Sequence, residues 1–108
     1  MELEIREDET TAVVCPRGDI IAVVVPDIRT KLRDLLGSGI RRLVVDLSQT
    51  YMIDSVGIGL LLAAYNSVHA AGGDFSVINA SYDILDLLRT LRLHQHFSVS
   101  GVPCGSVA

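Results

Sequence analysis

The stretch that decides the fold is residues 46–65, which read DLSQTYMIDSVGIGLLLAAY. It begins at the end of a short apolar run, Leu43–Leu47, of the kind that forms a central strand covered on at least one face. A polar connection follows over 48–53, and the apolar pattern then predicts a helix from about Ser55 to Ala71. A strand that leads into a helix in this way is the basic unit of α/β proteins.

The same alternation of strand and helix extends outward in both directions. Upstream, the pattern predicts a hairpin of two strands, at 2–6 and 11–17. A loop with a buried helix entry is expected at 18–25, and a helix at 26–36. Downstream, it predicts a strand that begins at 75 and then a helix capped by Ser81. A last short strand is expected from 93. We therefore expect a mixed α/β sheet of four to five strands. Its N-terminal edge strand is antiparallel, and the helices pack mainly on one face.

Length and composition narrow the class of protein. The chain has 108 residues, of which 49% are hydrophobic, so it can form one domain with a real core. We expect this domain over 1–99 and a flexible Gly/Ser/Pro-rich tail over 100–108. The net charge of −4 argues against direct binding to nucleic acid. Because the apolar runs are much shorter than the roughly 20 residues that cross a bilayer, and no segment resembles an export signal, we expect a cytoplasmic protein with no membrane partner.

The start of the helix at Ser55 is the most informative chemical feature. Asp and Ser are both common at helix N-termini, so Asp54-Ser55 can be read as a simple cap. The alternative is a phosphoacceptor: a phosphate on Ser55 would lie near the N–H groups of Val56 and Gly57 and the positive end of the helix dipole. Gly57 and Gly59 are both helix-disfavouring. They suggest a close backbone approach, either to a neighbouring element or to a ligand.

This helix is also apolar on more than one side. At 100° per residue, four apolar residues form the expected core stripe: Ile58, Leu61, Leu62 and Tyr65. Three others lie on roughly the opposite side: Val56, Leu60 and Ala63. Either another element covers this second side, or it is an interaction face. We expect Val56 and Leu60 to be partly exposed and to contribute to a partner surface with the Gly18–Ile21 loop.

Taken together, these motifs resemble those of STAS domains, specifically the bacterial anti-sigma-factor antagonists. The resemblance rests on Asp46-Leu47-Ser48 at the end of the strand and on the segment IDSVGIG at 53–59. It extends to the segments RGDI at 17–20 and AGGDFSV at 71–77, and covers residues 3 to about 99. Two positions depart from the family pattern: Val56, where a small residue is frequent, and Ile21, where an acid is usual.

The resemblance implies a binding switch without a cofactor. In that family the domain binds an anti-sigma factor that is also a serine kinase, and this binding frees a sigma factor. The kinase phosphorylates the serine that matches Ser55, and a metal-dependent serine phosphatase reverses the modification. The expected partner surface comprises Asp19, Ile20, Ile21, Asp54, Val56, Gly57 and Leu60. The departures at Ile21 and Val56 keep a second role open, as an adaptor in a stress-signalling assembly or a subunit of an ABC transporter.

Other classes of protein have weaker support in the sequence. A phosphoaspartate receiver domain could use Asp46 as its acceptor, but it would also need an acidic pair after the first strand and a late lysine, and the only lysine is Lys31. A hydrolase nucleophile elbow would need glycine at position 53, which is Ile53. The pair His94 and His96 is a weak metal signal. We therefore expect no enzyme activity and no metal site, and the oligomeric state stays open between a monomer and a weak dimer.

Overall fold

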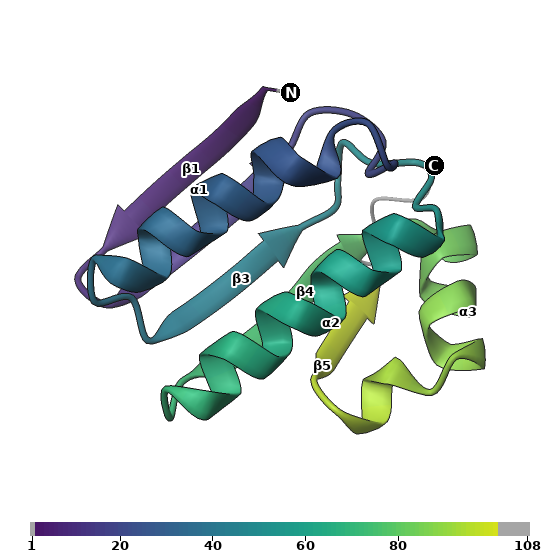
Figure 1. Ribbon diagram of the computed structural model, residues 1–108. Helices are drawn as coiled ribbons and strands as arrows, with labels where there is room; N and C mark the ends of the chain where they lie inside the picture. Colours follow the sequence, from purple (N-terminus) through teal and green to yellow (C-terminus); the bar gives the residue numbers. More distant parts are fainter. Residues whose placement is uncertain (1, 102–108) are drawn as a thin grey trace.

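Strands and helices alternate along the chain as the patterning predicts (Figure 1). The computed structural model describes residues 2–101. Its elements, in chain order, are β1 (Leu3–Asp8), β2 (Thr11–Pro16), α1 (Val25–Gly37), β3 (Arg42–Asp46), α2 (Ser55–Ala70), β4 (Asp74–Ala80), α3 (Tyr82–Thr90), the short 3₁₀ helix η1 (Leu93–Gln95) and β5 (Ser98–Gly101).

The strands form one mixed sheet in the order β1-β2-β3-β4-β5. Strands β1 and β2 form the predicted antiparallel hairpin, with Leu3 opposite Pro16, while β2, β3, β4 and β5 run parallel to one another. Pro16 is the last residue of β2, where its missing N–H removes no interior ladder bond. The predicted fold class, a mixed sheet with an antiparallel N-terminal edge strand, is therefore confirmed.

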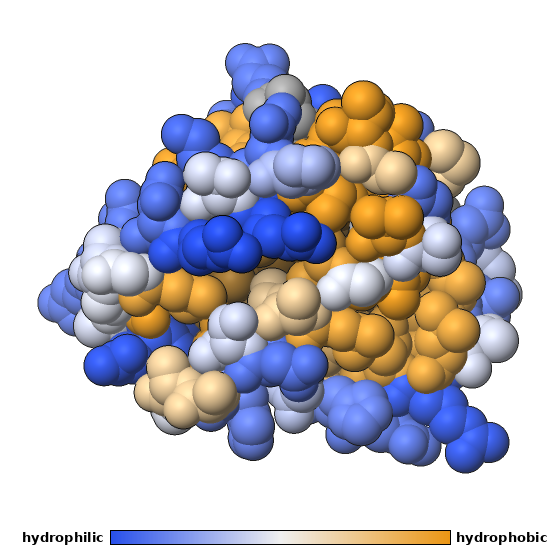
Figure 2. Space-filling model, in the orientation of Figure 1, coloured by the Kyte–Doolittle hydropathy of each residue, from blue (hydrophilic) through white to orange (hydrophobic). Residues whose placement is uncertain are grey.

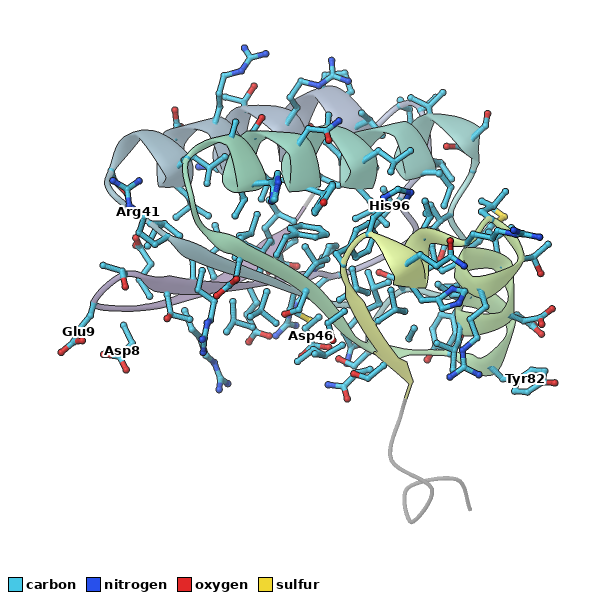
Figure 3. The ribbon with its side chains drawn as sticks, turned by 90° about the horizontal axis from the view of Figure 1, so that it is seen from below. Asp8, Glu9, Arg41, Asp46, Tyr82 and His96 are labelled. Carbon is cyan, nitrogen blue, oxygen red and sulfur yellow. The ribbon has the colours of Figure 1, made fainter. Side chains whose placement is uncertain are left out.

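Helices α1 and α2 lie side by side across one face of the sheet, and α3 lies beside β4 and β5 (Figure 3). Beneath α1 and α2, alternate strand residues point into the core and are almost fully buried: Ala12, Val14, Leu43, Val45, Phe75 and Val77. The residues between them on β2, β3 and β4 are only half-buried. One face of the sheet therefore forms the main core with the helices, and the other stays partly open.

The buried face of α2 differs from the one predicted. The structure buries Gly57, Leu60, Leu61, Ala64 and Val68, whereas Ile58, Leu62 and Tyr65 are only half-buried. The reason is that α2 is covered by two neighbours at once, because α1 packs along one side of it and the sheet lies beneath it. A single stripe drawn from helical periodicity cannot represent a helix that is buried on two sides.

At the C-terminal end, β5 includes Ser100 and Gly101, the first two residues of the segment that we expected to be a tail. The rest of that segment, 102–108, lies outside the described residues. The loop before α1 ends as predicted, with Val25 buried at the helix entry. No helix in the described part of the chain combines the length and the apolar character needed to cross a membrane.

Candidate functional site

Two loops meet at the end of the sheet where α2 begins. The loop between β2 and α1 pairs with the loop between β3 and α2 through a short parallel bridge of Ile20 and Ile53. The N–H of Ile20 donates to the carbonyl oxygen of Met52 at 3.0 Å, and the N–H of Asp54 donates to the carbonyl oxygen of Ile20 at 3.2 Å. These backbone hydrogen bonds join segments that are far apart in the sequence, and together they set the position of the first turn of α2.

A side-chain carboxylate reinforces this pairing from the first loop. Oδ1 of Asp19 accepts the N–H groups of Tyr51 and Met52, at 3.0 and 3.1 Å. From the second loop, the buried hydroxyl of Thr50 donates to the carbonyl oxygen of Gly18 at 2.9 Å. Asp19, which we expected on the partner surface, is thus half-buried and engaged inside the protein. Its main effect is to hold the loop that carries Tyr51 and Met52.

Asp54 has the same kind of role at the start of the helix. It is the N-cap of α2, and its Oδ1 accepts the N–H of Gly57 at 2.8 Å. Its Oδ2 accepts the N–H of Ala22, also at 2.8 Å, so one carboxylate links the helix to the opposite loop. The hydrogen bond from Gly57 lowers the pKa of Asp54 most, and the hydrogen bond from Ala22 has the next largest effect. Both lower it because they stabilise the ionised carboxylate. The capping role predicted from the sequence is confirmed.

The packing around Gly57 explains why one of the two glycines in this helix is needed. A Cβ at this position would overlap the carbonyl oxygen of Ile20 and lie 2.7 Å from Cγ2 of Ile53. The close backbone approach suggested by the sequence is therefore an approach to a neighbouring element of the fold. Gly59 differs, because a Cβ there would have no neighbouring atom within 4 Å.

Ser55 is the first residue of α2, and its side chain is exposed. Within residues 2–101 its hydroxyl takes part in no hydrogen bond, so it is accessible to another protein. Of the two N–H groups that we expected to hold a phosphate, that of Gly57 is already donated to Asp54. A phosphate on Ser55 would thus stand beside a carboxylate that occupies the helix N-terminus.

Exposed apolar side chains lie on the two loops and in the first turn of α2, which carries this serine. Four of them form what we call the apolar rim, and their exposed fractions are 77% for Val23, 75% for Tyr51, 51% for Met52 and 44% for Val56. Figure 2 shows hydrophobic side chains gathered over these two loops and the start of α2, at the upper right of the view. Of these four residues, only Val56 was expected on a partner surface. Tyr51 and Met52 were missed, although two large apolar residues in an otherwise polar connection are a signal for an exposed contact surface.

Three of the expected partner-binding residues are buried, and the predicted exposure of Leu60 is wrong. Ile20 is 1% exposed and Leu60 is 2% exposed, and Gly57 is buried against the first loop. Leu60 is buried because α1 covers that side of α2. Ile21 is half-buried, and only Val56 has the exposure expected of a contact residue.

Asp46, the possible acceptor of a receiver-type domain, lies at the end of β3 (Figure 3). Its Oδ1 accepts the N–H of Ser48 at 2.9 Å and the side-chain amide of Asn79 at 3.2 Å, so it ties β3 to β4 at this end of the sheet. Among the described residues, no group of three or more histidine, cysteine, aspartate or glutamate side chains could hold a metal ion.

Comparison with known proteins gives a consistent result. The family model described as the STAS domain matches residues 2–103. In structure, a Thermotoga maritima protein is similar with a TM-score of 0.87 and 15% identity, covering 96% of this chain and 90% of that one. An anti-sigma factor antagonist from Mycobacterium paratuberculosis has a TM-score of 0.81 and 21% identity, covering 96% of this chain and 87% of that one.

A third similar structure is known in two states. The anti-sigma factor antagonist SpoIIAA in its unphosphorylated form has a TM-score of 0.73 and 17% identity, covering 96% of this chain and 91% of that one. The phosphorylated form of the Bacillus protein SpoIIAA has a TM-score of 0.74 and 17% identity, covering 94% of this chain and 93% of that one. At these identities the comparison establishes a common fold.

Proposed function

Because the chain belongs to the STAS domain family, we propose that it is an anti-sigma-factor antagonist whose binding is switched off by phosphorylation of Ser55. In its unmodified form it binds an anti-sigma factor with serine-kinase activity and so frees a sigma factor. A metal-dependent serine phosphatase restores the unmodified form. The observation that carries the proposal is the exposed Ser55 hydroxyl, placed next to the Asp54 carboxylate at the start of a helix whose first turn and neighbouring loops carry the apolar rim.

The chemistry of this surface suits a switch that acts through charge. Phosphorylation would add about −1.5 to −2 charge units beside Asp54, which is ionised at neutral pH like an ordinary aspartate and has a pKa lowered further by the backbone N–H groups of Gly57 and Ala22. An apolar partner surface that packs against the rim would then have to desolvate two neighbouring anions. That cost, on the order of a few kcal/mol, would weaken binding by tenfold for each 1.4 kcal/mol.

Phosphorylation can act in this way without changing the fold. The loops on both sides of Ser55 are held by Asp19, Thr50 and Asp54, and none of these contacts uses the Ser55 hydroxyl. The phosphorylated and unphosphorylated forms of SpoIIAA are also similar to this chain to nearly the same degree, with TM-scores of 0.74 and 0.73. The modification is therefore expected to change the charge of a preformed surface.

The same contacts argue for regulated binding over catalysis. A serine nucleophile needs a neighbouring base that can take its proton. The carboxylate next to Ser55 is that of Asp54, and both of its oxygens already accept backbone N–H groups. Its lowered pKa also makes it a weaker base than an ordinary aspartate. We therefore expect this serine to be a substrate of another enzyme.

The decisive experiment measures phosphorylation and binding together. The protein is incubated with its cognate anti-sigma kinase and ATP, and the modified residue is identified by mass spectrometry. Binding of the kinase in the presence of ADP is then measured for the wild type, Ser55→Ala and Ser55→Asp. We expect phosphate on Ser55, tight binding by the wild type and by Ser55→Ala, and binding weakened at least about tenfold for Ser55→Asp.

A matched control is Ser98→Asp, which adds the same charge at an exposed serine at the beginning of β5. Binding by this variant should stay within about twofold of the wild type. Phosphate on a residue other than Ser55, or equal affinities for the two Ser55 variants, would contradict the switch. That result would favour an adaptor that binds its partner in a single state.

A further inference from the structure

A groove runs between helices α1 and α2 on the outer surface of the helical layer. It encloses about 220 Å³, and we call it the α1–α2 groove. Its floor is apolar: Leu36 from α1 is half-buried, and beneath it lie Leu32 from α1 and Leu60 from α2, which are 4% and 2% exposed. On the α2 side, Ala63 and Ser67 lie one helical turn apart and are exposed, so small side chains leave the groove open.

Two arginines follow the α1 side of this groove. Arg29 and Arg33 line it from positions one turn apart, about 6 Å along the helix axis. Figure 2 shows a strongly hydrophilic band between the two helices, next to the apolar residues of α2. Within the part of the chain that the structure describes, neither guanidinium has an ion pair, whereas Arg17 and Arg42 do. On a protein with a net charge of −4, this is a local reversal of sign.

We propose that the α1–α2 groove binds an acidic amphipathic helix of a partner protein. The apolar face of such a helix would rest on the leucine floor, as in other complexes where a helix lies in a hydrophobic groove. Carboxylates one turn apart along its edge would pair with Arg29 and Arg33, whose guanidinium groups can each bind a carboxylate through two parallel hydrogen bonds. The small residues Ala63 and Ser67 would let the docked helix approach α2 closely.

The size and openness of the groove favour a helix over a small molecule. Sites for small ligands usually enclose roughly 300–1,000 Å³, and this groove encloses less. The lining of the groove also extends along both helices, from Arg29 to Leu36 on α1 and from Leu60 to Ser67 on α2, which suits side chains that repeat at three- and four-residue intervals. This surface does not include Ser55, so the proposal holds whether or not that serine is phosphorylated.

Two synthetic helical peptides of about 18 residues, roughly five turns, test the proposal. Both carry the same stripe of leucines, which is flanked by glutamates in one peptide and by lysines in the other. Binding to the ¹⁵N-labelled protein is followed by NMR through the backbone amides of Ala63 and Ser67. We expect the glutamate peptide to shift these signals and the lysine peptide to leave them unchanged.

Charge reversal then locates the contact. The variant Arg29→Glu/Arg33→Glu should weaken binding of the glutamate peptide at least about tenfold and allow the lysine peptide to bind. The control Arg41→Glu/Arg89→Glu makes the same charge change at exposed arginines outside the groove and should keep the affinity within about twofold. If the first variant fails to fold by circular dichroism, Ala63→Trp fills the groove from an exposed position and should abolish binding.

Several results would overturn the proposal. One is equal binding of the two peptides, and another is a loss in the control variant as large as in the groove variant. A third is that the peptide shifts the signals of the apolar rim and not those of Ala63 and Ser67. A fourth is that sodium dodecanoate shifts the groove signals while the glutamate peptide does not, which would make the groove a site for anionic lipids.

Discussion

Oδ2 of Asp54 accepts the backbone N–H of Ala22 at 2.8 Å, which ties the start of α2 to a loop 32 residues earlier in the chain. The same carboxylate also caps α2 through Gly57. One side chain therefore positions both loops of the proposed switch, and its removal should loosen both of them.

Replacing Asp54 by alanine should destabilise the protein and loosen the first loop. Asp54→Ala removes a helix cap and the hydrogen bond to Ala22, so we expect the free energy of unfolding to fall by about 1–2 kcal/mol. Urea denaturation followed by circular dichroism measures this, and hydrogen exchange at the Ala22 amide should become faster. The control Asp83→Ala removes an exposed aspartate from the first turn of α3 and should change stability by less than about 0.5 kcal/mol. Equal losses of stability in the two variants would contradict the role of Asp54 in joining α2 to the first loop.

The contribution of Asp54 should depend on pH in a defined direction. Its native pKa lies below the ordinary value of 3.8, so the unfolded chain binds this proton first as the pH falls. The stabilisation is thus complete above about pH 5 and is lost as the pH falls from there through the lowered native pKa. The difference in Tm between the wild type and Asp54→Asn should shrink over that window. A difference that is constant or grows toward acid would show that the carboxylate charge has no such role.

The two glycines of α2 should respond in opposite ways to the same substitution. Gly57→Ala places a methyl group against the carbonyl oxygen of Ile20, and we expect it to lower the free energy of unfolding by about 1–3 kcal/mol. Gly59→Ala meets open space within the helix and should raise it by about 0.5–1 kcal/mol, because alanine favours helix. Thermal denaturation of the pair tests the close approach directly. A stabilising Gly57→Ala would show that the two loops are further apart than described.

Leu60 and Val56, which we expected on one partner surface, should differ in how much their substitution lowers stability. Leu60→Ala removes a side chain that is 2% exposed and should cost about 2–4 kcal/mol of stability. Val56→Ala, at 44% exposure, should cost less than about 1 kcal/mol. Leu60→Glu should therefore unfold the domain, whereas Val56→Glu should fold normally and bind the proposed anti-sigma partner more weakly. A folded Leu60→Glu would mean that α1 does not cover this side of α2.

The order of elements and the start of α2 could be predicted from local patterns in the sequence. Alternation in β1 and β2, the continuous apolar run of β3 and the caps at Asp54 and Ser81 each depend on residues close together in the chain. The family motifs lie in these same segments. For that reason the mixed sheet, its antiparallel edge strand and the exposed position of Ser55 were predictable.

The exposed surface around Ser55 could not be predicted, because it depends on contacts between segments that are far apart in the sequence. Periodicity places Leu60 on an outer side of α2, and only the packing of α1 against that side buries it. Asp19 was expected only on the partner surface and Asp54 only there and at the helix cap, but the meeting of two loops also makes their carboxylates hydrogen-bond acceptors for distant backbone N–H groups. The sequence by itself determined which elements form and where the serine stands. The tertiary structure alone decided which side chains around that serine face solvent, because burial depends on what packs against a residue.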